Sequence, residues 1–210
     1  MSALYYCRQT TTACKGIPYP SKTHPYRYGT AGCVYTSGCG VCASLMALRN
    51  STTRVFNTRQ WTHRCLGMGA RAAEGTDMAV VARHMKEKYG LDYAITTDMD
   101  RLVAHLKQGY KAIINVSGGG KMLFSNSGHY VLAAGIDKNG NLIILDPYWY
   151  DGKFTLTAAR RKYTRVKNGR EVYVRPADLK GDVLSLWLFT PKRDVRLAYS
   201  THCLLYTSDA

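Results

Sequence analysis

The sequence contains no long apolar run. No stretch approaches the about 20 consecutive apolar residues that a membrane-spanning helix needs. The first residues, MSALYYCRQTTTACKG, also lack the charged start and long apolar segment of a secretory signal peptide. We therefore expect neither a membrane span nor export, and a chain that acts in the cytoplasm or is delivered by a phage rather than secreted.

Acidic residues are scarce. The chain has 14 Asp and Glu against 29 Lys and Arg, which gives a formal net charge of +15. Such a balance favours anionic partners, such as nucleic acid, teichoic-acid-like polymers or acidic membrane surfaces. The densest basic stretch, ARRKYTRVKNGR (Ala159–Arg170), is interpreted as a solvated face open to an anionic polymer. Nucleic acid is an unlikely partner, because no helix-turn-helix, zinc-finger or RNA-binding signature accompanies the charge.

The end of the chain differs from the rest. The last eight residues, CLLYTSDA (Cys203–Ala210), resemble the translation of a transposon end used to prepare sequencing libraries. We expect them to be a non-native tail on an environmental sequence of bacterial or phage origin. Without this tail six cysteines remain, an even number that would also suit disulfides. Because a chain of this length can bury a sizeable core and shows no export signal, we expect mostly reduced thiols.

Helix signals come first along the chain and strand signals follow. Residues 1–27, rich in Pro and Tyr, predict an extended N-terminal arm. Apolar stripes and capping residues predict helices over Gly38–Asn50, Thr76–Tyr89 and Asp98–Lys107. Strands are predicted over Asp92–Thr96, Lys111–Val116, His129–Ile136, Asn141–Pro147, Glu171–Pro176 and Val183–Phe189. This order predicts one α+β domain over residues 28–202, with helices packed on an antiparallel sheet.

Cys39 lies at the start of the first of these helices, in the stretch YTSGCGVCASLM. Unpaired N–H groups and the helix dipole favour an anion at a helix N-terminus, so the pKa of a thiol there is lowered. The same N–H groups can stabilise the oxyanion that forms when a thiolate attacks a carbonyl. Gly38 and Gly40 permit a tight turn and a close backbone approach on either side. We interpret Cys39 as a nucleophile and Cys42, one turn later, as a core residue.

Two other interpretations of this C-x-x-C pair remain open. A thioredoxin-like redox pair would need a βαβ context, which the element order lacks. A zinc site would have to add Cys33, His63 or Cys65, and the HRC triplet does not repeat the usual ligand spacing. We therefore expect no metal and no cofactor.

His129 and Asp146 are the candidates for the base and for the group that orients it. His129 begins a predicted strand after the small residues SNSG, where a cleft would reach it. Asp146 ends the next strand, before Pro147, which keeps it extended. A base that takes the thiol proton, oriented by a third group, is what cysteine nucleophiles require.

Three motifs in this order carry a family resemblance. SGCGVCASLMAL, GHYVLAAGID and GNLIILDPY resemble the papain-like cysteine peptidases of the bacteriocin-leader-processing, double-glycine type and their stand-alone relatives. The resemblance covers about Tyr28 to Tyr148. It implies a papain-like fold with Cys39 as nucleophile, His129 as general base and acid, and Asp146 as the orienting carboxylate.

The sequence departs from this family in two respects. The family often carries a Gln shortly before the nucleophile that donates to the oxyanion, but Thr30–Ser37 has none. Cys33, Tyr35, Thr36 or Ser37 could replace it, or the backbone N–H of Cys39 could act without a side chain. The transporter segment that follows in members cutting after double glycine is also missing here.

The spacing of His129 and Asp146 adds a geometric condition. A simple hairpin turning at Asn139–Gly140 would pair Asp146 with Ala133, four residues from His129. That offset is about 13 Å along a strand, too far for a hydrogen bond. A working triad therefore requires a hairpin that is slipped, bulged or longer-looped.

These observations predict a peptidase that uses a Cys-His-Asp triad and an acyl-enzyme intermediate. The expected substrate is a peptide, either a precursor or leader peptide or a cell-wall (peptidoglycan) peptide. A catalytically inactive papain-fold binding module and a metal or redox C-x-x-C protein are the alternatives.

Overall fold

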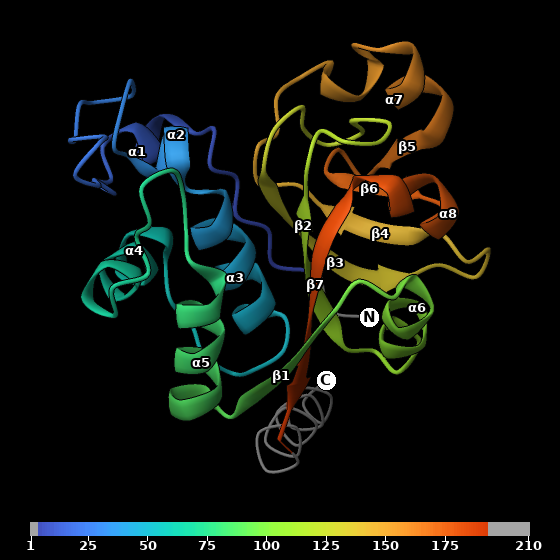
Figure 1. Cartoon of the computed structure of the whole chain (residues 1–210), viewed down its shortest axis with the longest axis horizontal. Helices are drawn as coiled ribbons and strands as arrows, with labels where there is room; N and C mark the ends of the chain where they lie inside the picture. The colour runs from blue at the N-terminus through green and yellow to red at the C-terminus, as the bar shows by residue number, and fades with distance from the viewer. Residues whose placement is uncertain (1–3, 193–210) are drawn as a thin grey trace, which may run out of the picture.

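A computed structural model describes residues 4–192 of the chain. It has a helical half, which contains α1–α5, and a half built on an antiparallel sheet, which contains β1–β7 (Figure 1). The predicted tail at 203–210 and the predicted domain end at 202 lie outside the described residues. Within the described part, no helix is long and apolar enough to cross a membrane.

The helices of the first half lie one after another along the chain. Their bounds, with those of the three helices beside the sheet, are α1 Thr12–Lys15, α2 Val34–Ser37, α3 Cys39–Arg49, α4 Thr58–Gly67, α5 Met78–Tyr89, α6 Met99–Lys107, α7 Ala158–Tyr163 and α8 Pro176–Leu179. Asp77 and Asp98 cap the N-termini of α5 and α6 with their side chains, and Gly90 ends α5 in the left-handed conformation.

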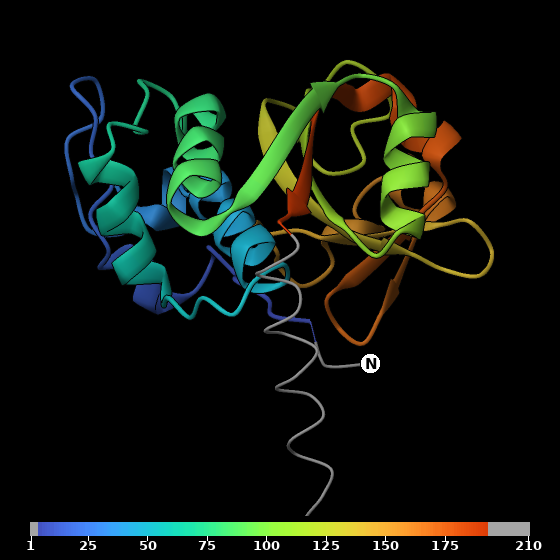
Figure 2. The same ribbon diagram turned by 90° about the horizontal axis from the view of Figure 1, so that it is seen from below.

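The sheet has seven strands in the order β1-β7-β2-β3-β4-β6-β5, and all neighbours are antiparallel. The strands are β1 Leu91–Thr96, β2 Lys111–Val116, β3 His129–Ile136, β4 Leu142–Leu145, β5 Thr164–Lys167, β6 Glu171–Val174 and β7 Val183–Pro191. Figure 2 shows β1 crossing from the end of α5 to the sheet, so that it joins the two halves. The predicted α+β class is confirmed.

The central strands are buried on both faces. Ile113 and Leu132 pack into the core shared with the helices α3, α4 and α5, whereas Ile114 and Val131 pack into a second core on the other face. Because side chains alternate along a strand, one strand can serve both cores, and such a strand is almost continuously apolar. This explains why IINV and HYVLAA were readily identified as strands.

Helix α3 lies against β3 and is the most deeply buried helix of the first half (Figure 1). Its residues from Gly40 to Leu48 are all buried. A Cβ atom at Gly38 would lie 2.4 Å from the Val34 carbonyl oxygen, and one at Gly40 would lie 2.5 Å from the Cβ of Thr76. The two glycines therefore allow α2 and the segment before α5 to approach closely on either side of Cys39, as the sequence predicted.

The β3–β4 hairpin is bulged, and this meets the geometric condition set by the sequence. Ile136 pairs with Leu142, one residue away from the register of the simple hairpin. An irregularity beside Gly135 shifts the register by one residue more, so that Leu132 lies opposite Leu145. Continuing that register places Asp146 two residues from the level of His129, about 7 Å along the strand instead of about 13 Å. The side chains share one face of the sheet and can span this distance.

Several regions differ from the sequence-based expectation, and two of them are large. Helix α4 was missed because only three of its residues, Trp61, Thr62 and Cys65, are buried, so its apolar stripe is short. The basic stretch Ala159–Arg170, expected as a solvated face, forms most of α7 and all of β5. Its exposed basic side chains are solvated, but Arg160 is buried and donates to the carbonyl oxygens of two other segments.

The N-terminal arm is more than a surface layer. Its described residues, 4–27, have little regular structure apart from α1. Nevertheless they bury four side chains in the core of the helical half, namely Cys7, Cys14, Ile17 and Tyr19.

We predict that Gly40→Ala destabilises the fold, because its methyl group would overlap the Thr76 side chain. Overpacking of this kind costs about 1–3 kcal/mol. The urea midpoint of unfolding measures the effect. Gly67→Ala is the matched control, since nothing lies within 4 Å of its added Cβ and it sits in a helix. Equal midpoints for the two variants would contradict the close approach.

Candidate active site

Cys39 is the first residue of α3 and is partly exposed. The other five cysteines within residues 4–192 are buried, namely Cys7, Cys14, Cys33, Cys42 and Cys65. Burial raises the pKa of the Cys39 thiol, but the hydrogen bond and charge of His129 and the N–H groups of Tyr130 and Gly40 lower it below its ordinary value. A thiol that is both accessible and acidified has the properties of a nucleophile.

His129, the first residue of β3, connects the thiol to a carboxylate. Its Nε2 atom lies 2.8 Å from Oδ1 of Asp146, which leaves Nδ1 for the thiol of Cys39. Burial alone would lower the pKa of His129, but the Asp146 carboxylate and the Cys39 sulfur together raise it to about 9. The imidazole is therefore poised to hold a proton while the thiol loses one.

Asp146 follows β4 and is fully buried. Its Oδ1 atom accepts the backbone N–H of Tyr148 (2.9 Å) as well as the His129 ring, and its Oδ2 atom lies 2.5 Å from Nζ of Lys153. Burial would raise the pKa of this carboxyl group, but the charges of Lys153 and His129 and their hydrogen bonds lower it below its ordinary value. A buried carboxylate with this many donors is a fixed anion.

The structure thus brings Cys39, His129 and Asp146 together, although the chain separates them by up to 107 residues. Cys42 is fully buried within α3, in the helical core. Among residues 4–192, no group of three or more His, Cys, Asp or Glu side chains is placed to hold a metal ion.

The N-terminal arm is hydrogen-bonded along the segment that follows Asp146. The Tyr6 hydroxyl donates to the Asp146 carbonyl oxygen (2.7 Å), the Gln9 N–H donates to the Pro147 carbonyl oxygen (2.9 Å), and the Thr10 hydroxyl donates to the Trp149 carbonyl oxygen. These contacts fix the loop that carries the carboxylate.

Gln9 was missed by the sequence analysis. Its side chain is almost fully buried, and Nε2 donates to the carbonyl oxygens of Tyr35 (3.1 Å) and Val34 (3.5 Å) in the helix just before Cys39. Its Oε1 atom is buried and has no hydrogen-bond partner among the described residues. Gln9 lies far from Cys39 in the sequence and reaches α2 only through the fold, so no local spacing signals that contact.

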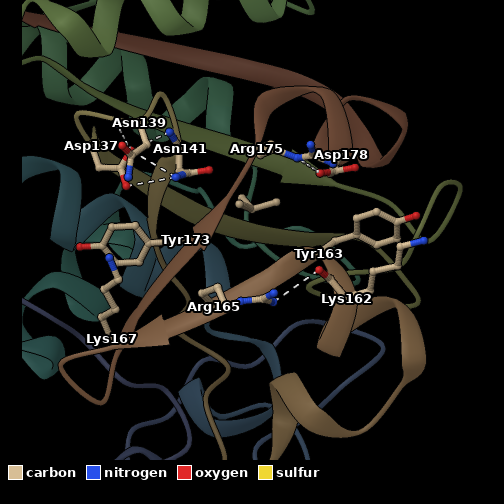
Figure 3. Close-up of a pocket in the computed structure, with 11 residues that line it drawn as sticks. Asp137, Asn139, Asn141, Lys162, Tyr163, Arg165, Lys167, Tyr173, Arg175 and Asp178 are labelled. Atoms are coloured by element: carbon tan, nitrogen blue, oxygen red, sulfur yellow. Dashed lines mark hydrogen bonds and ion pairs between the residues drawn. The ribbon is translucent and has the colours of Figure 1, made fainter.

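A separate hollow of about 300 Å³ is lined by the β3–β4 turn, α7, β5, β6 and α8, and by none of the three candidate residues (Figure 3). Arg175 donates to Asp178 (2.6 Å), Arg165 donates to main-chain carbonyl oxygens, and Lys167 lies over the ring of Tyr173 (4.3 Å). Each of these cations already has a partner, and none of the three candidate residues lines the hollow, so it is separate from the candidate active site.

The fold was compared with known structures. The peptidase domain of Streptococcus ComA, a bi-functional ABC transporter involved in a quorum-sensing pathway, is 14% identical over 73% of this chain and 91% of that domain, with a TM-score of 0.48. The peptidase domain of Streptococcus mutans ComA is also 14% identical, over 74% of this chain and 93% of that domain, with a TM-score of 0.44. No curated protein matches the chain significantly.

A family match covers a longer part of the chain than the three motifs do. Residues 14–173 match the model described as the Peptidase_C39 like family. The match spans well over half of the chain and includes Cys39, His129 and Asp146. The resemblance inferred from the three motifs is therefore confirmed: the chain belongs to the C39-like peptidase family.

Proposed function

We propose that this protein is a cysteine peptidase in which Cys39, His129 and Asp146 act as the catalytic triad. One observation carries the proposal: Cys39 is partly exposed, His129 lowers the pKa of its thiol, and the His129 ring lies 2.8 Å from the buried Asp146 carboxylate. Membership of a peptidase family supports the reaction class. The triad assignment itself rests on the geometry.

The reaction follows from the positions of these groups. His129 accepts the Cys39 proton, and the thiolate attacks an amide carbonyl carbon to form a tetrahedral intermediate. The imidazolium then donates its proton to the leaving amine as the C–N bond breaks, which leaves an acyl-enzyme. A water molecule, deprotonated by His129, hydrolyses the thioester and regenerates the thiol. Asp146 keeps the imidazole in the required orientation and stabilises its charged form.

The oxyanion is proposed to be stabilised from two sides. The first backbone N–H groups of α3, including that of Cys39, have no partner within the helix and no side-chain cap, so they are available to an oxyanion at its N-terminus. Gln9 is the proposed side-chain donor, because its amide lies against α2, which ends at Ser37. Its Nε2 contact with the Val34 carbonyl oxygen is long (3.5 Å), and in this proposal that hydrogen turns to the oxyanion when substrate binds. In this proposal Gln9 replaces the Gln that the sequence lacks between Thr30 and Ser37.

The proposed substrate is a peptide, of the precursor or leader class or of the cell-wall class. Tyr148 packs edge-on against His129, with ring centroids 6.3 Å apart, and remains about two-fifths exposed. It therefore offers an apolar surface beside the reacting groups, where a substrate side chain could pack. An inactive papain-fold binding module would have the same fold without an activated thiol.

The first experiment measures alkylation of each cysteine by iodoacetamide across pH, with mass spectrometry to locate the label. We expect Cys39 to react far faster than the other cysteines at pH 6, because His129 stabilises its thiolate. His129→Ala removes that stabilisation and should slow Cys39 by more than tenfold at this pH. Wild type and Cys39→Ala are then incubated with leader-type and cell-wall-type peptides, and cleavage is followed.

The buried Cys42 is the internal control, since it lies on the same helix. Reaction of Cys39 at the rate of an ordinary thiol, with a pKa of about 8.5, would reject the triad and favour the binding module. An activated Cys39 that cleaves only one of the two peptide classes would assign the substrate.

A second prediction concerns Gln9. Gln9→Ala should lower kcat for peptide cleavage by about 10²–10³-fold, the usual loss of one oxyanion donor. Alkylation of Cys39 forms no oxyanion, so its rate at pH 6 should stay within about twofold of wild type. A parallel fall in both rates would show instead that Gln9 only supports the local structure.

A further inference from the structure

Lys153 is a buried cation directly behind the proposed triad. It is 2% exposed, although lysine is rarely buried without a partner. Its ammonium group donates to Oδ2 of Asp146 (2.5 Å) and to the carbonyl oxygen of Tyr148 (2.8 Å). It also lies 5.3 Å from the centre of the Tyr148 ring and 5.6 Å from that of Phe154. The ammonium group thus has an anion, a carbonyl dipole and two aromatic rings as neighbours.

The local chain holds Lys153 in this position. Gly152 adopts a left-handed conformation (φ 79°), and a short 3₁₀ turn, Lys153–Thr155, begins immediately after it. The buried guanidinium of Arg160, on α7, donates to the Lys153 carbonyl oxygen (3.2 Å). The lysine therefore enters the site on a fixed backbone, so its side chain is pre-organised.

The two oxygens of the carboxylate have different partners. His129 and the Tyr148 N–H occupy Oδ1, and Lys153 occupies Oδ2. Cation, anion and imidazole therefore lie in one row that continues to the thiol of Cys39. A row of this kind alternates in charge when the thiol is ionised: ammonium, carboxylate, imidazolium, thiolate.

We propose that Lys153 is a positioning residue of the active site, which fixes the Asp146 carboxylate and sets the pH range in which the Cys39–His129 pair is charged. The inference rests on the proposed function and adds Lys153 to the three residues of the proposed triad. Lys153 touches neither the thiol nor the imidazole, so it acts through Asp146 and through its field.

The direction of the effect follows from charge alone. A cation favours the deprotonated form of every acid near it, so its removal raises the pKa values of Asp146, His129 and Cys39 together. Two other titratable or charged groups lie near this row, and the substitution does not alter them. They are Tyr6 on the N-terminal arm and Arg160 on α7. Arg160 is the second cation near Lys153 and limits the shift.

The test is the pH dependence of Cys39 alkylation by iodoacetamide in Lys153→Met, Lys153→Gln and Lys153→Arg. Loss of the charge in the Met and Gln variants should move the inflection of the rate upward by about 0.5–1 pH unit. Lys153→Arg keeps the charge, so its inflection should stay at the wild-type pH. Lys167→Met, which removes an exposed lysine from β5, is the matched control and should also leave the inflection unchanged.

The outcomes separate this inference from the proposed function. A folded Lys153→Gln protein with the wild-type inflection overturns the role proposed for Lys153. This holds even if its melting temperature falls, because a purely structural lysine changes stability without moving the inflection. If Lys153→Met does not fold, the Gln variant decides alone, since its amide can still donate to Asp146. A wild-type Cys39 that titrates as an ordinary thiol rejects the triad itself.

Discussion

The structure of the site depends on one buried anion, the carboxylate of Asp146. An isolated carboxylate in a protein interior would be neutralised, because its desolvation costs more than a single contact returns. Here the group accepts hydrogen bonds from Tyr148, His129 and Lys153. The position of the imidazole, the loop after β4 and the burial of the lysine are all consequences of satisfying this charge.

The sequence predicted those parts of the fold whose signals lie in consecutive residues, such as apolar periodicity and turn residues. The strands from Lys111 to Val116 and from His129 to Ile136 were predicted with their observed bounds, because their apolar runs and flanking turns lie in consecutive residues. The helix at Cys39 was predicted because Gly38 and Gly40 mark its start. Each of these signals is short-range, and each element is stabilised by a core that the pattern already implies.

The parts that the sequence did not predict depend on contacts between distant segments. A slipped, bulged or longer-looped hairpin was recognised as a requirement, but nothing in the sequence showed which of these it is or that the irregularity lies beside Gly135. Gln9 precedes Cys39 in the sequence, and Lys153 follows Asp146. No sequence spacing reveals the contacts of either side chain. A lysine seven residues after an aspartate normally predicts a solvated side chain, so its burial follows only from the fold.

The N-terminal arm has a consequence for the order in which the site is assembled. The Tyr6 hydroxyl meets the Asp146 carbonyl oxygen across 140 residues of sequence. Long-range contacts of this kind form late in folding, since the loop they close must first be ordered. During synthesis, Cys39 emerges well before the strand and loop that carry His129 and Asp146. The nascent chain therefore exposes an ordinary thiol, and the geometry that acidifies it arises only when most of the domain has been made.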